Sequence, residues 1–395
     1  MSGIRVLVAT RLYAPEVAAA AFRLRALARG LAANGSEVRV VTTRPPRHSP
    51  KPPKDRGVRV SRFPVLRDSG GNVRGYLQYL SFDLPLFFRL LFARGDLVIC
   101  EPPPTTGTVV ALTSWLRRRP YVHYAADIWT DGVVALGAPR FVVAIMRTLE
   151  RFTLRNAALV LAVSDGVAER VSEFGVPAER ITNIGNGVDM ETFRLDGEVQ
   201  HESRPTFVYT GSMSEWQTPG VFVKALPRVL EEFPSARIHF FGQGVEEEAT
   251  RQLAEQLAPG SVEFGGVVAP AVAARWLRGA TAALASITPG VGYDFAKPTK
   301  IYAAASCGAP VVFAGIGAGA QLVAESGLGW RAGYDPAEVA EAMIAAARAE
   351  ANGERAARAA ERSRWVADNA SLDAIGDRGA KAALATVGNS APVTG

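Results

Sequence analysis

Short apolar segments that alternate with amphipathic helical segments constrain the fold of this chain more than any other feature. Residues 4–10 and 38–42 are apolar runs, and between them residues 24–31 carry leucine and alanine at the three- and four-residue spacing of a helix with one apolar face. The same alternation begins again after a polar break at residues 195–204. Strands that alternate with helices predict parallel sheets covered by helices on both faces.

The expected strands divide into two sets, one on each side of the polar break. The first set is residues 4–10, 38–42, 58–63, 96–100, 122–125 and 159–164, and the second is residues 207–210, 237–241, 262–264, 282–287 and 310–314. We therefore predict an α/β protein with two Rossmann-like parallel-sheet domains that face each other across a ligand-binding cleft. The predicted domains are residues 1–195 and 196–360, and residues 361–395 form a C-terminal helix that packs back toward the first domain and ends in a frayed tail.

Length and composition fit this plan. A chain of 395 residues with 48% apolar and 21% charged residues is globular and long enough for two domains. Two cysteines, Cys100 and Cys307, cannot build a disulfide framework, and the four histidines show no metal-ligand spacing. The longest apolar run, residues 84–92, contains a proline and an arginine and is too short to span a bilayer. No signal-peptide pattern precedes the first strand, so we expect a cytoplasmic protein.

The net charge of +6 has three candidate explanations: nucleic acid, an anionic membrane surface, or a polyphosphate substrate. Neither zinc-finger spacing nor an aromatic-basic RNA signature is present, so we expect no nucleic-acid partner. Residues 76–92 mix tyrosine, phenylalanine, leucine and arginine. This composition fits a core helix and, equally well, a helix that rests on the inner face of a membrane to meet a lipid-linked acceptor.

Residues 297–312 contain the strongest local signal for a binding site. Lys297, Pro298, Thr299 and Lys300 precede an alanine-rich helix, and proline is favourable in a first helical turn. Free backbone N–H groups and the positive end of the helix dipole point outward at such a terminus. Two lysines at this end predict an anion site, for which a nucleotide diphosphate is the expected ligand. The alternative is an ordinary helix start with solvated lysines.

Further motifs follow one another in an order shared with a known protein family. They are residues 13–16, Arg23, and residues 27–35, 96–99, 102–104, 127–129, 186–189, 209–212, 242–244 and 265–267, with the 297–312 segment closing the series. From about residue 4 to about residue 350, the chain resembles the retaining GT-B glycosyltransferases of the family-four group. It is most similar to the WbuB-like subgroup of bacterial cell-surface sugar transferases.

This resemblance implies a GT-B fold and a metal-independent glycosyltransferase of the hexosyltransferase type. A nucleotide sugar would be the co-substrate, with no other cofactor. The acceptor hydroxyl would belong to a glycan, a lipid-linked molecule or a small molecule, and the pathway would be cell-envelope polysaccharide biosynthesis. The resemblance also implies front-face attack, in which the leaving phosphate takes the acceptor's proton.

Site residues are assigned from the local sequence together with this resemblance. The donor-binding residues are Gly211, Ser212, Gly242, Asp294, Lys297, Pro298, Thr299 and Lys300, and the acceptor-side residues are Glu16, Ala18 and Arg23. Asp127, at the end of an expected strand, is the catalytic candidate, and its alternative role is a plain helix N-cap. For Glu16 and Arg23 a surface ion pair is an equally good explanation. No metal ligand is assigned.

The sequence departs from the family at the donor site. The family pattern has two glutamates eight residues apart, and Phe295 and Ala303 stand at those positions here. An alanine cannot accept hydrogen bonds from ribose hydroxyls. Asp294 could substitute for the first glutamate, or Tyr302 for part of the second. The arginine and lysine that usually follow the first strand of the second domain are also absent, and the two lysines of the anion site could supply that charge.

Two other functions are compatible with these departures. The first is a catalytically degenerate GT-B subunit that acts as a partner protein. The second is a GT-B sugar-nucleotide epimerase, which would need a cluster of carboxylates and histidines. Only Asp127 and Asp131 are visible candidates for that cluster.

Overall fold

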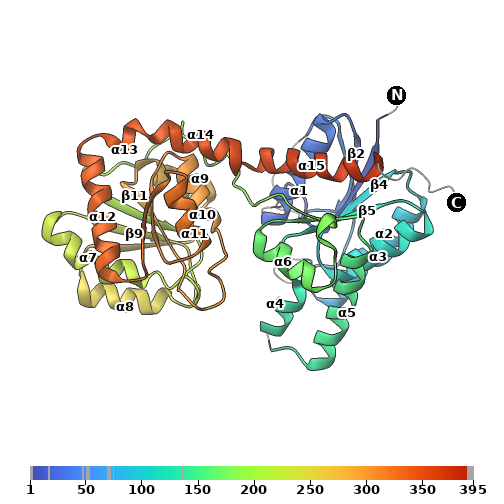
Figure 1. Cartoon of the computed structure of the whole chain (residues 1–395), viewed down its shortest axis with the longest axis horizontal. Helices are drawn as coiled ribbons and strands as arrows, with labels where there is room; N and C mark the ends of the chain where they lie inside the picture. The colour runs from blue at the N-terminus through green and yellow to red at the C-terminus, as the bar shows by residue number, and fades with distance from the viewer. Residues whose placement is uncertain are drawn as a thin grey trace. The chain divides into compact units, whose positions relative to one another are not determined.

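The computed structural model describes residues 3–16, 18–46, 49, 54–68, 73, 75–135 and 137–388. The chain divides into two compact units between Asn186 and Gly187, and it returns to the first unit between Ser371 and Leu372 (Figure 1). The expected polar linker at residues 195–204 lies inside the second unit. It is held there because Gln200 donates its N–H to the carbonyl of Arg275, at 3.0 Å.

A seven-stranded parallel sheet forms the centre of the first unit. Its strands are β1 (Arg5–Ala9), β2 (Glu37–Thr43), β3 (Val58–Phe63), β4 (Leu97–Cys100), β5 (Tyr121–Ala125), β6 (Leu159–Ala162) and β7 (Ile181–Asn183). They lie in the order β3-β2-β1-β4-β5-β6-β7. The order reverses direction between β1 and β4, which is the topological switch point of this sheet. Only β7 was not predicted, because a three-residue strand carries too little periodicity.

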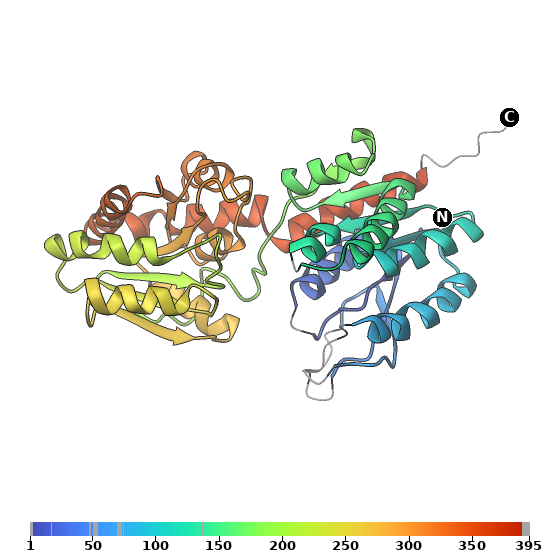
Figure 2. The same cartoon turned by 90° about the horizontal axis from the view of Figure 1, so that it is seen from below.

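Helices cover both faces of the first sheet. They are α1 (Ala19–Ala33), α2 (Tyr76–Phe92), α3 (Pro104–Leu116), α4 (Trp129–Ala135), α5 (Arg140–Asn156), α6 (Asp165–Glu173) and α15 (Leu372–Gly388). α2, α3 and α5 share one core cluster with the sheet, and α1 and α15 share the cluster on the other face (Figure 2). The expected C-terminal helix is thus α15, whereas the tail beyond residue 388 lies outside the described residues.

The second unit repeats this plan with six parallel strands. They are β8 (Thr206–Thr210), β9 (Arg237–Phe241), β10 (Val262–Gly266), β11 (Ala282–Ser286), β12 (Val311–Ala314) and β13 (Gly329–Ala332), in the order β10-β9-β8-β11-β12-β13. The switch point therefore lies between β8 and β11. β13 was not predicted, since its four residues include a glycine and an arginine. The predicted fold class, two Rossmann-like parallel-sheet domains, is confirmed.

Two layers of helices enclose the second sheet. They are α7 (Gly220–Glu232), α8 (Glu247–Leu257), α9 (Pro270–Gly279), α10 (Thr299–Ser306), α11 (Ala318–Glu325), α12 (Pro336–Ala351), α13 (Glu354–Ala357) and α14 (Ala359–Asn369). α7 and α12 pack in one core cluster, and α9, α10 and α14 pack in the other. Within the described part of the chain, no helix is both long and apolar enough to cross a membrane.

The contact between α1 and α15 depends on two glycines. A Cβ atom on Gly30 would lie 2.6 Å from the carbonyl oxygen of Gly376, and a Cβ atom on Gly376 would overlap the carbonyl oxygen of Ala26. Backbone atoms cannot move away as a flexible side chain can, so the two helix axes approach closely only because both positions lack a side chain.

We expect Gly376→Ala to lower the free energy of unfolding of the first unit by about 1–3 kcal/mol, through overpacking against the α1 backbone. Gly132→Ala is the matched control, because Gly132 lies in α4 and a Cβ there meets nothing within 4 Å. That control should leave stability unchanged or raise it by up to about 1 kcal/mol. Urea denaturation of the three proteins makes the comparison, and equal midpoints for the two variants would contradict it.

Candidate functional site

The switch point of the first unit brings together residues that follow three neighbouring strands. Thr10 follows β1, Glu101 follows β4 and Asp127 follows β5. The Thr10 hydroxyl donates a hydrogen bond of 2.7 Å to Oε1 of Glu101. Arg23 of α1 lies close enough for its charge to lower the pKa of both carboxyl groups. These residues form the edge cluster, which we define as Thr10, Arg11, Arg23, Glu101 and Asp127.

Glu101 is the most perturbed acid of the edge cluster. Burial raises the pKa of Glu101 from 4.5 to about 7, although Arg23 and the Thr10 hydrogen bond act in the opposite direction. A carboxyl group with a pKa near neutrality is a feature of functional sites in α/β proteins. Glu101 was missed in the sequence, where the available signal was its position directly after a buried strand at the centre of the sheet.

Asp127 does not act as a helix cap. The first amides of α4 are capped by Glu150 of α5, which accepts hydrogen bonds from the N–H groups of Trp129 at 2.8 Å and Thr130 at 2.9 Å. Asp127 is exposed at its edge, yet desolvation by the surrounding protein raises the pKa of its carboxyl group, while the charge of Arg23 opposes this shift. No hydrogen bond to the Asp127 carboxylate occurs among the described residues. Its carboxylate is therefore available to a ligand.

Arg11 adds a second positive charge to the edge cluster. Its guanidinium carbon lies 4.2 Å from the ring centre of Tyr79 and 5.8 Å from that of Trp129. One terminal nitrogen donates to the carbonyl oxygen of Val73 at 3.0 Å, whereas Nε is buried without a partner among the described residues. Arg11 was not assigned from the sequence, because its aromatic neighbours are distant along the chain.

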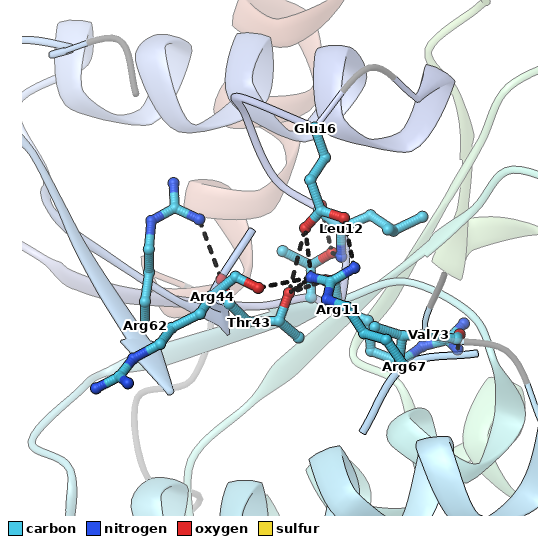
Figure 3. Close-up of polar contacts among 9 residues, drawn as sticks. Arg11, Leu12, Glu16, Thr43, Arg44, Arg62, Arg67 and Val73 are labelled. Atoms are coloured by element: carbon cyan, nitrogen blue, oxygen red, sulfur yellow. Dashed lines mark hydrogen bonds and ion pairs between the residues drawn. The ribbon is translucent and has the colours of Figure 1, made fainter. Parts of the chain in front are cut away.

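Glu16 has a different partner from the one expected. Its two carboxylate oxygens accept hydrogen bonds from Arg67, at 3.0 and 3.2 Å, and Arg67 also binds the Thr43 hydroxyl (Figure 3). The ion pair is largely buried, so the expected surface pair between Glu16 and Arg23 is not formed. Ala18 precedes the first turn of α1, and its N–H donates to the carbonyl of Glu16 at 3.2 Å.

At the switch point of the second unit, two glycines allow the backbone turns after β8 and β9 to touch. Gly211 and Gly242 have φ angles of +111° and +140°, which L side chains rarely adopt. A Cβ on Gly242 would overlap the carbonyl of Gly211. Ser212 lies in the same turn, and its hydroxyl donates to Oε1 of Gln217 at 3.2 Å. A ligand phosphate can approach the bare backbone at this edge.

Lys300, in the first turn of α10, reaches the same edge. Its Nζ lies 3.7 Å from the ring centre of Tyr209 and would lie 3.7 Å from a Cβ on Gly211. The stem of the side chain is partly exposed, but Nζ itself is buried and has no hydrogen-bond partner among the described residues. Burial lowers the pKa of Lys300 well below its usual value. The structure thus places an unpaired amino group beside Gly211.

The other predicted donor residues lie on the loop that enters α10. The Asp294 carboxylate accepts a hydrogen bond from the N–H of Gly290 at 3.2 Å, and its carbonyl accepts one from Ala318 at 2.9 Å, so Asp294 holds the loop in shape. Lys297 and Thr299 are exposed, whereas Pro298 is buried at the N-cap position of α10.

Phe295 and Ala303 have distinct surroundings. Phe295 is exposed next to Tyr293, whose ring stacks on Trp216 with the ring centres 4.9 Å apart. Ala303 is buried in an apolar core cluster of the second unit. Tyr302 is buried, and its ring stacks on Trp365 of α14 with the ring centres 6.4 Å apart.

In the part of the chain that the structure describes, His, Cys, Asp and Glu side chains form no group of three or more that could hold a metal ion.

Two family models match the chain in succession. The glycosyl transferase 4-like domain matches residues 19–187, and the model for glycosyl transferases group 1 matches residues 204–348. No curated protein matches the sequence.

Three solved structures share this two-domain fold: one protein bound to UDP, one glycosyltransferase and one epimerase. HepE from Anabaena, in complex with UDP, has a TM-score of 0.66 and 16% identity, with 97% of this chain and 100% of that chain covered. WaaG, a glycosyltransferase involved in lipopolysaccharide biosynthesis, has a TM-score of 0.62 and 16% identity, with 95% and 99% covered. A putative UDP-N-acetylglucosamine 2-epimerase from Listeria monocytogenes has a TM-score of 0.56 and 12% identity, with 99% and 98% covered. At these identities the likeness establishes the GT-B fold.

The raised pKa of Glu101 predicts a specific pH dependence of stability. The unfolded chain releases this proton near pH 4.5 and the folded chain near pH 7. Between these values the folded state binds more protons, so the free energy of unfolding falls as pH rises through this window. Relative to Glu101→Gln, the wild type should lose roughly 2–4 kcal/mol between pH 4 and pH 8. Urea denaturation at a series of pH values, with hydrogen exchange of first-unit amides as the probe, measures this free energy of unfolding. Parallel pH profiles for the wild type and Glu101→Gln would refute the prediction.

Proposed function

We propose that this chain, both units of which match glycosyl transferase models, is a glycosyltransferase that moves a sugar from a nucleoside-diphosphate sugar to an acceptor hydroxyl. We propose further that the anomeric configuration is retained and that no metal ion takes part. The observation that carries this proposal is the buried, unpaired Nζ of Lys300 beside the Gly211 turn.

In this proposal the donor diphosphate binds at the start of α10. The helix dipole, the free amides of the first turn and Lys300 all favour an anion there. The Lys300 amino group has lost its solvation without gaining a partner, so a phosphate oxygen would supply the missing interaction. The same charge would stabilise the diphosphate as it leaves. The donor nucleotide is proposed to be UDP, because HepE has been solved in complexes with UDP and UDP-glucose.

The acceptor is proposed to bind at the edge cluster of the first unit. Asp127 would orient the acceptor hydroxyl, because its carboxylate has no hydrogen bond among the described residues. In the proposed front-face reaction the acceptor oxygen bonds to the anomeric carbon as the bond to the phosphate breaks. The acceptor's proton passes to the leaving phosphate oxygen, and the protein forms no covalent intermediate.

For the acceptor, we propose a glycan or a lipid-linked saccharide of the cell envelope, met by a cytoplasmic protein at the inner face of the membrane. The WaaG neighbour, which is involved in lipopolysaccharide biosynthesis, supports this choice. The epimerase alternative rests on a shared fold alone. The degenerate-subunit alternative rests on Phe295 and Ala303, and the turnover experiment below tests it.

Lys300→Ala should weaken UDP binding by about 1.5–3 kcal/mol, the range for a hydrogen bond to a charged group. Because burial lowers the pKa of Lys300 in the free protein, binding of the diphosphate should also raise the pKa of this amine. Calorimetry in two buffers of different ionisation enthalpy measures both effects. Lys224→Ala, at an exposed lysine of α7, is the matched control. Unchanged UDP affinity in Lys300→Ala would rule out this anion site.

Asp127→Asn should lower turnover by about 10²-fold or more, while UDP affinity stays at the wild-type value. Asp131→Asn is the control, since Asp131 lies nearby but is paired with Arg170. The assay follows release of nucleotide diphosphate from a panel of nucleotide sugars, with acceptor extract and with EDTA present. Failure of the wild type to consume any donor would favour the degenerate subunit, and activity restored only by added metal would refute metal independence.

A further inference from the structure

The outward faces of three neighbouring helices of the first unit expose large apolar side chains. They are Leu77, Leu80, Leu84, Phe88 and Phe92 of α2, Leu112, Trp115 and Leu116 of α3, and Phe141, Ile145 and Phe152 of α5. We call this set the outer apolar face. α3 packs against both α2 and α5, so the three helices are neighbours in this unit. The α2 residues of the set are between 52% and 79% exposed.

α2 is apolar on both of its faces. Phe82, Leu86 and Leu90 are fully buried against the sheet, and the exposed row lies on the opposite side of the helix. A helix that covers a sheet normally has a polar outer surface. Contiguous exposed apolar surface of this kind marks an interaction site.

The charges around this surface have one sign. The acidic residues on α2, α3 and α5 are Asp83 and Glu150, and both are buried. Asp83 accepts a hydrogen bond of 2.6 Å from the Thr106 hydroxyl, and Glu150 caps α4. The exposed charged side chains on and directly after these helices are all basic, and they include Arg94, Arg117, Arg118, Arg140, Arg147 and Arg151.

An arginine-lined hollow adjoins the outer apolar face at the C-terminal end of α5. Its volume is about 930 Å³, and Arg151, Arg155 and Arg180 line it together with Phe152 of the outer apolar face. Arg180 donates to the carbonyl oxygens of Arg155 and Ala157, at 3.1 and 3.2 Å, which fixes its position. Among the residues that the structure describes, no acidic side chain lines the hollow. An anionic group can therefore bind at the border of the apolar surface.

We propose that the outer apolar face docks on an anionic lipid bilayer. The leucine, phenylalanine and tryptophan side chains enter the boundary between headgroups and acyl chains, and the arginines contact lipid phosphates, with the hollow beside α5 holding one headgroup. An apolar surface bordered by arginines, with no exposed acid on its helices, matches a negatively charged membrane better than a neutral one. Membrane docking deepens the proposed function and rests on that proposal only for the identity of the acceptor. The test of docking is independent of catalysis.

Vesicle flotation tests the docking. The full chain should float with vesicles of phosphatidylcholine and phosphatidylglycerol, bind pure phosphatidylcholine vesicles less, and lose binding in 1 M salt. The double variant Leu84→Ser/Phe88→Ser should reduce the partition coefficient at least about tenfold. Leu257→Ser, an exposed leucine of α8 in the second unit, should not change it. Binding of the double variant equal to that of the wild type would overturn the proposal.

Trp115 reports whether this surface enters the bilayer. It is 76% exposed in the middle row of the outer apolar face. Lipids brominated on their acyl chains should quench the tryptophan fluorescence of the wild type but not that of Trp115→Phe. The chain has six tryptophans, so five remain in the variant and still fluoresce. Equal quenching of the two proteins would overturn the proposed orientation.

A second copy of the chain is the competing occupant of this surface. Light scattering without lipid should give a monomer, and a dimer that Leu84→Ser/Phe88→Ser converts to monomers would overturn lipid docking. Circular dichroism of each variant checks that it is folded. UDP titration separates the two proposals. Flotation without UDP binding would support membrane docking and contradict the transferase proposal, whereas UDP binding without flotation would support the transferase proposal and contradict docking.

Discussion

The parallel pairing of β1 with β4, and of β8 with β11, is the constraint on which both candidate sites depend. At these two places the connecting helices leave toward opposite faces of the sheet, and a ligand can bind between them at the ends of the central strands. Thr10 and Glu101 therefore face one open edge, and Gly211 and Lys300 reach the other. The hydrogen bonding of the sheet backbone, rather than any single side chain, decides where a ligand can bind.

The two edges hold buried ionisable groups of opposite type. In the first unit the pKa of Glu101 is raised by burial, and in the second the pKa of Lys300 is lowered by burial. Burial makes the charged form of each group less favourable than it is in water. The adjacent residues, Arg23 at one edge and Tyr209 at the other, lessen this cost without removing it. Groups held in this way gain most from a ligand that completes their interactions.

Most of the fold could be read from the sequence, because buried strands of four to seven residues leave a continuous apolar run. β7 and β13 were missed, since three or four residues that include polar side chains or glycine have no such run. Lys300 could be found because a helix start has a local signature. The raised pKa of Glu101 could not be found, because it comes from burial of the carboxyl group in the folded unit, where Thr10 and Arg23 oppose the shift.

The alternative explanation for Glu16, a surface ion pair with Arg23, was wrong for a similar reason. Arg67 lies 51 residues further along the chain, and only the pairing of β2 with β3 brings it near. The domain limits at residues 195 and 360 also differ from the observed ones at 186 and 371, because residues in each polar stretch hydrogen-bond to the second unit. Local composition identifies a polar segment, but its long-range hydrogen bonds decide which unit it joins.

The return of α15 to the first unit has a consequence for how the protein is made. Ile375, Ala380 and Ala383 of α15 complete the core in which Leu24 and Leu27 of α1 are buried. Every strand of the first sheet leaves the ribosome before any part of the second unit, yet the last helix of its core is translated after the second unit is complete. The unit synthesised first is therefore the last to finish folding, and during elongation its nascent α1 presents an uncovered leucine surface for which chaperones and neighbouring chains compete.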